Sequence, residues 1–275
     1  ARNAICPSHY MGAIELYRTT GEARYLDLAE TFLEMRDLVS QGTSGGDDNQ
    51  DRVPFLEQRE IVGHAVRATY LYAGAADLYA ETGDSRWITP LVPVWENMVR
   101  KKLYITGACG ALYDGASPDG SANQRRITRV HQAFGRNYQL PNTTAHNETC
   151  ANIGNLLWSW RMFLITGDGK YVDVLERALY NSVLSGVSLS GTEYFYVNPL
   201  RVVDPLPTRL RYPRTRQPFF TSFCCPPNLL RTIAEVSGYA YSKDNDSVWV
   251  NLYGANQLDT TMFGEPLQIT QITQY

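Results

Sequence analysis

The sequence lacks a strong excess of charge of either sign. Lys and Arg total 25 and Asp and Glu total 28, for a formal net charge of −3. No basic stripe of the kind that tracks a nucleic-acid backbone is present. The chain also lacks any run of about 18 apolar residues, the length that a membrane-spanning helix needs. We therefore expect neither a nucleic acid nor a membrane as a partner.

Cysteine is scarce and unevenly placed. There are five cysteines, at positions 6, 109, 150, 224 and 225. An odd number excludes a disulfide framework that uses every cysteine, and the CxxC pairs typical of zinc fingers are absent. Some of the thiols are therefore expected to be free or bound to a metal ion.

The 275 residues, 44% of them hydrophobic, are typical of a globular chain. No signal peptide is recognisable after Ala1, which leaves a removed one open, and the sequence stops in the middle of a strand-like pattern near Tyr275. We expect a fragment of a longer protein. The sequence leaves its compartment open.

A short motif of Thr-Gly, an acidic residue and, three positions later, an aromatic residue occurs three times. Each copy lies between two stretches of helical period, because Gly can end one helix and the acid can begin the next. The motif predicts three helix-turn-helix hairpins. Its copies are Thr20–Tyr25, Thr82–Trp87 and Thr166–Tyr171.

The hairpin repeat, followed by strand-like runs, predicts a mainly α protein, an α/α toroid that is incomplete at its N-terminus and leads into a β domain. The helices before the motifs are expected over 10–19, 62–81 and 150–165, and those after them over 26–35, 88–101 and 172–184. Loops are expected over 41–55, 106–128 and 198–220. We predict a helical part over 1–190, a site-bearing loop and last helix over 191–240, and the start of a β-sandwich over 241–275.

Glu148, Cys150, Cys224 and Cys225 form a donor set that tetrahedral Zn²⁺ accepts. Glu148 and Cys150 would lie just before a helix, where the helix N-terminus favours thiolates. Adjacent Cys224 and Cys225 point apart in a strand, so their convergence requires a turn, which Pro226 and Pro227 would hold. A vicinal disulfide and two packed thiols remain alternatives at this point.

Four segments together resemble glycoside hydrolase family 127, over most of the chain. They are Asn137-Tyr-Gln-Leu-Pro-Asn-Thr-Thr-Ala-His-Asn-Glu-Thr-Cys150, Glu193-Tyr-Phe-Tyr-Val-Asn-Pro199, Cys224-Cys-Pro-Pro-Asn228 and Val62-Gly-His-Ala-Val-Arg-Ala68. The resemblance implies an (α/α)6 barrel followed by β-sandwich domains. It also implies an exo-acting β-L-arabinofuranosidase or a related enzyme of plant-wall and pectic glycans, with an oligosaccharide as its partner.

The resemblance also assigns roles to residues. Cys224 matches the nucleophile, which is at the same time a zinc ligand. Glu148, Cys150 and Cys225 match the other three ligands. Glu176 and Tyr196 match positions that support the substrate or the nucleophile, His64 matches a sugar-contacting histidine, and His131 is a further substrate-binding candidate. Without the resemblance, the alternative for His64 is a core histidine in an apolar helix, and the alternative for Glu176 is a position on a solvated helix face.

One residue departs from the family pattern. The general acid/base glutamate of the family falls on Gln132, and an amide cannot donate the proton that a leaving oxygen needs. Glutamine is explained by a natural subgroup, by an engineered exchange, or by an inactive glycan-binding relative. We favour the subgroup, in which the substrate carries its own carboxyl group or another residue is the acid. The candidates for that acid are Glu57, Glu60, His131 and Asp114.

An acidic branched sugar of pectin, such as aceric acid, would suit this subgroup. Its carboxylate would need a cation, for which the sequence offers Arg59, Arg67, Arg125 and Arg136. A zinc-containing homologue that binds carbohydrate without catalysis is the alternative function. The sequence does not determine the oligomeric state, for which a homodimer is one option.

Overall fold

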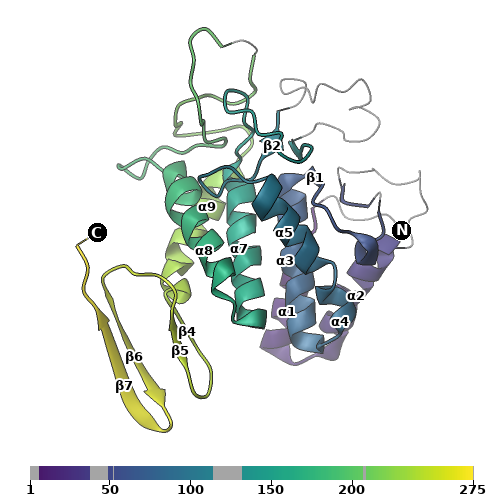
Figure 1. Cartoon of the computed structure of the whole chain (residues 1–275), viewed down its shortest axis with the longest axis vertical. Coiled ribbons are helices and arrows are strands. Elements are labelled where there is room, and N and C mark those ends of the chain that lie inside the picture. The colour runs from purple at the N-terminus through teal and green to yellow at the C-terminus, as the bar shows by residue number, and fades with distance from the viewer. Residues whose placement is uncertain (1–5, 38–48, 52, 114–131, 207–208, 275) are drawn as a thin grey trace. The chain divides into compact units, whose positions relative to one another are not determined.

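The computed structural model describes residues 6–37, 49–51, 53–113, 132–206 and 209–274. The chain divides into two compact units, Ala1–Leu229 and Leu230–Tyr275. The described residues are rich in helix, as the sequence predicts (Figure 1). The part boundaries expected near residues 190 and 240 stay a prediction.

The three Thr-Gly motifs form helical hairpins, as predicted. They connect α1 (His9–Thr20) to α2 (Ala23–Asp37), α3 (Ala65–Thr82) to α4 (Ser85–Ile88), and α7 (Thr149–Thr166) to α8 (Gly169–Ala178). Each glycine has a left-handed φ of 66–71°, which glycine adopts without steric cost. Each threonine hydroxyl donates to the carbonyl four residues earlier and accepts from the backbone N–H of the acidic residue. The repeated sequence therefore encodes a repeated turn.

Three of the expected helices differ from the prediction. The helix expected over 62–81 begins only at Ala65, because Gly63 and His64 pair with Phe134 and Ala133 in a short strand, β1 (Gly63–His64). The helix expected over 88–101 ends at Ile88 and resumes as α5 (Leu91–Lys101), with Pro90 at its N-cap and Pro93 in its first turn. Proline lacks an N–H and is tolerated only at such positions. The helix expected over 172–184 begins earlier and ends at Ala178, followed by a π-helical turn, η3 (Leu179–Val183), and a 3-10 turn, η4 (Leu184–Gly186).

Helices α3 and α7 lie side by side at the centre of the first unit (Figure 1). Their approach depends on Gly154, where an added Cβ would lie 2.1 Å from Thr69 Oγ1 and 2.8 Å from Thr69 Cβ. Tyr72 of α3 packs on Trp158 of α7, with ring centroids 4.9 Å apart. Because α3 begins directly after His64 and α7 directly after Glu148, this close packing fixes two site segments relative to each other.

A small buried sheet stands at the start of α3. Its order is β1-β3-β2, formed by Gly63–His64, Ala133–Phe134 and Ala111–Leu112, all antiparallel. His64 pairs with Ala133, so the residue before Ala133, Gln132, is held next to His64. A 3-10 turn, η2 (Phe55–Glu57), precedes this region.

Helix α9 (Cys225–Glu235) begins in the first unit, and the second unit continues with a 3-10 turn, η5 (Val236–Tyr239). Two antiparallel strand pairs follow, β4 (Tyr241–Lys243) with β5 (Val248–Val250), and β6 (Asn256–Met262) with β7 (Glu265–Gln271). Phe263 and Gly264, both at positive φ, form the two-residue turn between β6 and β7. Among the described helices, none is long and apolar enough to cross a membrane.

Candidate active site and metal centre

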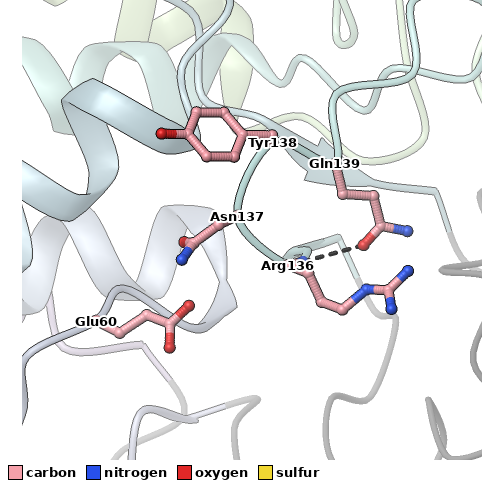
Figure 2. A pocket seen from close by; sticks show the side chains of 5 residues that line it. All are labelled: Glu60, Arg136, Asn137, Tyr138 and Gln139. Carbon is pink, nitrogen blue, oxygen red and sulfur yellow. Dashed lines mark hydrogen bonds between the residues drawn. The ribbon is translucent and has the colours of Figure 1, made fainter.

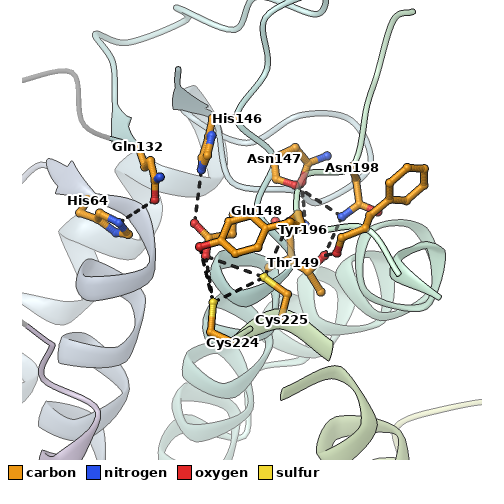
Figure 3. A network of polar contacts seen from close by, with 12 residues as sticks. His64, Gln132, His146, Asn147, Glu148, Thr149, Tyr196, Asn198, Cys224 and Cys225 are labelled. Carbon is orange, nitrogen blue, oxygen red and sulfur yellow. Dashed lines mark hydrogen bonds and ion pairs between the residues drawn. The ribbon is translucent and has the colours of Figure 1, made fainter. Parts of the chain in front are cut away.

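The structure brings Glu148, Cys150, Cys224 and Cys225 together. One ligand atom from each lies within 4.8 Å of the others. Glu148 Oε1 is 3.8 Å from the sulfur of Cys224 and 3.9 Å from that of Cys225, and these two sulfurs are 3.8 Å apart (Figure 3). The vicinal disulfide is therefore not formed, and all the described thiols are free.

The Asn147–Cys150 segment is positioned by a second segment that runs beside it. Glu148 pairs with Val197 in an isolated antiparallel bridge, and the Thr149 N–H donates to the Tyr196 carbonyl over 3.0 Å. The Asn198 N–H donates to the Asn147 carbonyl over 2.8 Å. Glu148 is the N-cap of α7 and Cys150 lies in its first turn, as the sequence predicts. The same pairing carries Tyr196 to the cluster.

Cys224 and Cys225 converge because the chain turns into a helix at this point. Cys225 is the first residue of α9, and the Asn228 N–H donates back to the Cys224 carbonyl. The Asn228 amide also donates to the Tyr70 hydroxyl of α3 over 2.7 Å. The Cys-Cys-Pro-Pro-Asn motif is thus tied to α3. Cys225 is buried, whereas Cys224 is exposed.

Burial and crowding of acidic groups determine the protonation of the cluster. Burial raises the pKa of Glu148. The pKa of Cys225 is raised mainly by burial and, to a smaller extent, by its hydrogen bond with Cys150. The hydrogen bond with Cys224 raises the pKa of Cys150. Hydrogen bonds from Cys150 and Cys225 lower the pKa of Cys224 far below its ordinary value, although burial opposes this. Negative charge in the cluster is therefore favoured on Cys224, its exposed residue.

Such a cluster suits a thiophilic cation. Three thiols and one carboxyl group within 4.8 Å resist ionising together, and a divalent cation offsets that repulsion. Among the described residues, the basic group at the cluster is His146, whose Nε2 lies 3.3 Å from Glu148 Oε2. A neighbouring polar group of this kind orients a carboxylate that ligates a metal. The donor set therefore fits a metal ion.

Sequence reasoning missed His146 and Tyr212. His146 is 1% exposed, and its ring meets that of Tyr113 edge to face. Tyr212 stacks on Tyr196 with ring centroids 3.9 Å apart, and the Tyr196 hydroxyl lies 3.5 Å from Cys224 Sγ. His146 is two residues before Glu148, a spacing that could have identified it. Tyr212 falls in the segment expected to be a loop, where no pattern distinguishes it.

His64 and Gln132 form a buried pair. His64 Nε2 lies 3.0 Å from Gln132 Oε1, and the Ala65 N–H donates to the Gln132 carbonyl (Figure 3). Gln132 has a φ of 54°, a left-handed conformation that is strained for a residue with a side chain. Strain of this kind collects at functional sites. The Gln50 amide donates to the His64 carbonyl and helps to hold the pair.

A cavity of about 390 Å³ adjoins this pair. It is lined by Tyr113, Gln132, Arg209, Leu210 and Arg211. Tyr113 packs in the same core cluster as Cys150, Tyr196 and Cys225. The cavity therefore lies beside the Glu/Cys cluster and opens onto the residue that departs from the family pattern.

Other predicted residues lie elsewhere. Glu60 forms an ion pair with Lys102 over 2.9 Å and lines a second cavity, of about 650 Å³, with Arg136, Asn137, Tyr138 and Gln139 (Figure 2). Glu57 is exposed. Glu176 lies in the last turn of α8, and no hydrogen bond or ion pair joins its carboxylate to another described residue.

The remaining candidates are the four arginines proposed to bind a carboxylate and the two acid candidates His131 and Asp114. Arg59 donates to backbone carbonyls, Arg67 to Asn49, and Arg136 faces the second cavity. None of these three lines the cavity at Gln132. His131, Asp114 and Arg125 lie outside the described residues.

A family model described as "Beta-L-arabinofuranosidase, GH127 catalytic domain" matches residues 1–238. The chain belongs to glycoside hydrolase family 127. It is 32% identical to a non-reducing end β-L-arabinofuranosidase of Bifidobacterium longum subsp. longum over 258 residues, which are 86% of this chain and 37% of that protein. The resemblance seen in the sequence is thereby confirmed.

Solved GH127 structures share the fold. A structure titled "Glycoside hydrolase" is 55% identical with a TM-score of 0.92. The match covers 100% of this chain and 45% of the other chain. A GH127 β-L-arabinofuranosidase from Geobacillus stearothermophilus T6 is 35% identical with a TM-score of 0.84. The match covers 97% of this chain and 42% of that enzyme's chain. This GH127 chain therefore spans less than half the length of these relatives.

Proposed function

We propose that this GH127 chain carries the catalytic centre of a zinc-dependent, retaining, exo-acting glycoside hydrolase with a cysteine nucleophile. Its proposed substrates are plant-wall oligosaccharides that end in a β-L-arabinofuranoside or in an acidic pectic sugar. The observation that carries the proposal is the site itself, in which Cys224 is the one exposed residue beside three buried donors. A purely structural cluster would have no need of an accessible thiol.

Zn²⁺ is the proposed metal, held by Glu148, Cys150, Cys224 and Cys225. Three thiols with one carboxylate are soft and borderline donors, which favour zinc over magnesium or calcium. When bound, the zinc ion would keep the coordinated thiols deprotonated at neutral pH. His146 supports the set by holding the Glu148 carboxylate.

The proposed reaction proceeds in two displacements. The Cys224 thiolate attacks the anomeric carbon, the carbon–sulfur bond forms, and the bond to the leaving oxygen breaks. That oxygen takes up a proton. Water then attacks the same carbon, the carbon–sulfur bond breaks, the water loses a proton, and the thiolate is regenerated. Two inversions give net retention of the anomeric configuration.

Neighbouring residues would orient the sulfur and the sugar. The Tyr196 hydroxyl lies 3.5 Å from Cys224 Sγ, and the stacked ring of Tyr212 fixes its direction. His64 reaches the cavity side through its contact with Gln132 and is proposed to contact the sugar. For Glu176 and His131 the supporting argument is the family pattern alone.

Gln132 requires a different source of the proton. An amide has no acidic proton at neutral pH, so the acid is another residue or the substrate. Glu60 is disfavoured, because its carboxylate pairs with Lys102 and faces the other cavity. We propose that the glutamine is natural and marks a subgroup of the family.

The larger architecture also belongs to the proposal. Three hairpins of one design support an (α/α)6 barrel, to which this chain would contribute the later helices. The two antiparallel strand pairs near the C-terminus support the start of a β-sandwich. The proposed division stays at 1–190, 191–240 and 241–275.

An activated aryl β-L-arabinofuranoside has a leaving group that needs no proton. Its hydrolysis therefore tests the role of the nucleophile independently of which group serves as the acid. We expect hydrolysis by the parent and a loss of at least about 10³-fold in Cys224→Ser. Cys6→Ser is the matched control, since Cys6 is an exposed thiol remote in sequence from the cluster. Equal rates in Cys224→Ser and the parent would refute the nucleophile.

A non-catalytic, zinc-containing, carbohydrate-binding homologue is the second candidate function. Gln132 favours it, because an amide without an acidic proton stands, buried, at the family's acid/base position. If the parent shows no turnover of arabinofuranosides or pectic oligosaccharides and Gln132→Glu gains it, the binding function is correct. Turnover in the parent that is lost in Cys224→Ser supports the enzyme.

A further inference from the structure

The cavity at Gln132 is positively charged. Arg209 and Arg211 line it, and neither is ion-paired with a carboxylate among the described residues. Arg211 stands over the ring of Tyr212, with its Cζ 5.2 Å from the ring centroid. Because Tyr212 stacks on Tyr196, the Arg211 backbone position is tied to the residue beside Cys224. Two cationic side chains therefore line the cavity that lies beside the Glu/Cys cluster.

A second and independent observation concerns the Tyr113 hydroxyl. Tyr113 is 4% exposed and lines the same cavity. Burial raises the pKa of its hydroxyl, whereas a hydrogen bond from the Tyr212 backbone and the charge of Arg214 lower it. The hydroxyl proton itself has no acceptor among the described residues, so a ligand oxygen is its natural partner.

Arg214 adds to the positive field. Its Nη2 donates to the carbonyls of Thr143 and Arg201, while its buried Nε and Nη1 have no hydrogen-bond partner among the described residues. Arg214 does not line the cavity itself, but its charge acts on the Tyr113 hydroxyl, which does. An anion bound beside Arg209 and Arg211 would therefore be attracted by a third positive charge as well.

Gln132 fits this field better than glutamate would. None of the described residues that line the cavity is acidic, and Gln132, which matches the family's acid/base glutamate by resemblance, carries a neutral amide. A carboxylate at Gln132 would neutralise one guanidinium and repel an incoming anion. The exchange of Glu for Gln therefore changes the charge of the cavity as well as its acid/base chemistry.

We propose that Arg209 and Arg211, with the Tyr113 hydroxyl, form a subsite for a carboxylate carried by the bound sugar. This inference rests on the proposed function only in taking the ligand to be a glycan. The planar guanidinium matches a carboxylate through two parallel hydrogen bonds, and a tyrosine hydroxyl donates a third. The cavity volume of about 390 Å³ accommodates a single sugar unit rather than an extended chain. Arg209 and Arg211 replace Arg59, Arg67 and Arg136 as the carboxylate-binding candidates.

The test compares two columns of immobilised oligosaccharides released from pectin, one native and one with its carboxyl groups reduced to alcohols. We expect the 275-residue chain to be retained on the native column and at least about tenfold less on the reduced one. Arg209→Gln and Arg211→Gln should each lose retention about tenfold, and Gln132→Glu should weaken it on the native column only. Arg24→Gln, which removes the charge of another exposed arginine, on α2, is the matched control and should be retained like the parent.

Tyr113→Phe guards against misfolding, because it removes one hydroxyl and keeps the packed ring. Its melting temperature should stay close to that of the parent while its retention falls. Equal retention on both columns, or losses in Arg24→Gln as large as those in the cavity variants, would overturn the subsite. Displacement by inorganic phosphate more readily than by galacturonic acid would also overturn it.

Hydrolysis of the neutral aryl arabinofuranoside is measured in parallel. If turnover depends on Cys224 and the two columns do not differ, the subsite is wrong and the proposed function stands. If retention depends on the arginines and turnover is absent, the subsite stands and the proposed function fails.

Discussion

Gly154→Ala tests whether the α3/α7 packing holds the two halves of the site in place. The new Cβ would lie 2.1 Å from Thr69 Oγ1, 2.8 Å from Thr69 Cβ and 2.9 Å from Tyr70 Cδ2, where ordinary contact begins near 3.4 Å. Thr69 cannot simply rotate away, because its hydroxyl bonds to the Ala65 carbonyl over 3.0 Å. The two helices must therefore separate or shift locally.

The expected magnitude follows from two opposing effects. Alanine favours the helix over glycine by roughly 0.5–1 kcal/mol, whereas forcing an extra carbon into a packed core costs roughly 1–3 kcal/mol. Because all three contacts at Gly154 fall below 3.0 Å, we expect a net loss of about 1–2 kcal/mol. For a chain of this size the melting temperature should fall by a few degrees, about 2–4 °C per kcal/mol.

Gly12→Ala is the matched control, measured by the same urea and thermal unfolding followed by circular dichroism. Gly12 lies inside α1, and an added Cβ would meet nothing within 4 Å. This variant should gain roughly 0.5–1 kcal/mol from helix propensity alone. If Gly154→Ala is as stable as the parent or more stable, the helices do not approach as described.

Three further variants probe the metal centre, a helix cap and a buried ion pair. Cys225→Ala should lower the zinc content measured by elemental analysis to well below one ion per chain, while Cys6→Ala should leave it unchanged. Asp168→Ala should melt at a lower temperature than the parent above pH 5. The hydrogen bond from the Lys170 N–H lowers the native pKa of Asp168, so the difference in melting temperature should vanish as the pH falls through that native pKa. A difference that persists at low pH would contradict the cap. Asp77→Asn should lower the free energy of unfolding in urea by about 3 kcal/mol. The reason is that the guanidinium of Arg161, which lies 2.6 Å from the Asp77 carboxylate, loses its charge partner. A loss below about 0.5 kcal/mol would show that solvent screens the pair.

Local patterns predicted much of the fold. The Thr-Gly motif specifies its hairpin through contacts within five residues, so the sequence suffices to locate each turn. Helix ends were less predictable where a proline or tertiary packing interrupts the helical period. Pro90 divides one expected helix, and the π-helical turn after Ala178 depends on tertiary packing that no local pattern records.

The site was predictable where it resides in motifs and unpredictable where it depends on long-range contacts. Glu148, Cys150, Cys224 and Cys225 stand in two recognisable segments, and the structure brings them together. The cationic cavity was missed because Arg209 and Arg211 belong to an irregular segment that approaches Gln132 only through the fold. Nothing in the local sequence distinguishes these arginines from solvated ones.

The central claim is that Cys224 becomes covalently bonded to the sugar. The most direct measurement is mass spectrometry of the protein quenched in acid during turnover of an activated β-L-arabinofuranoside, followed by peptide mapping. The account predicts a mass increase of one anhydropentose unit on the peptide that contains Cys224, and no adduct in Cys224→Ser. An adduct on a different residue, or steady turnover with Cys224 alkylated beforehand, would contradict it.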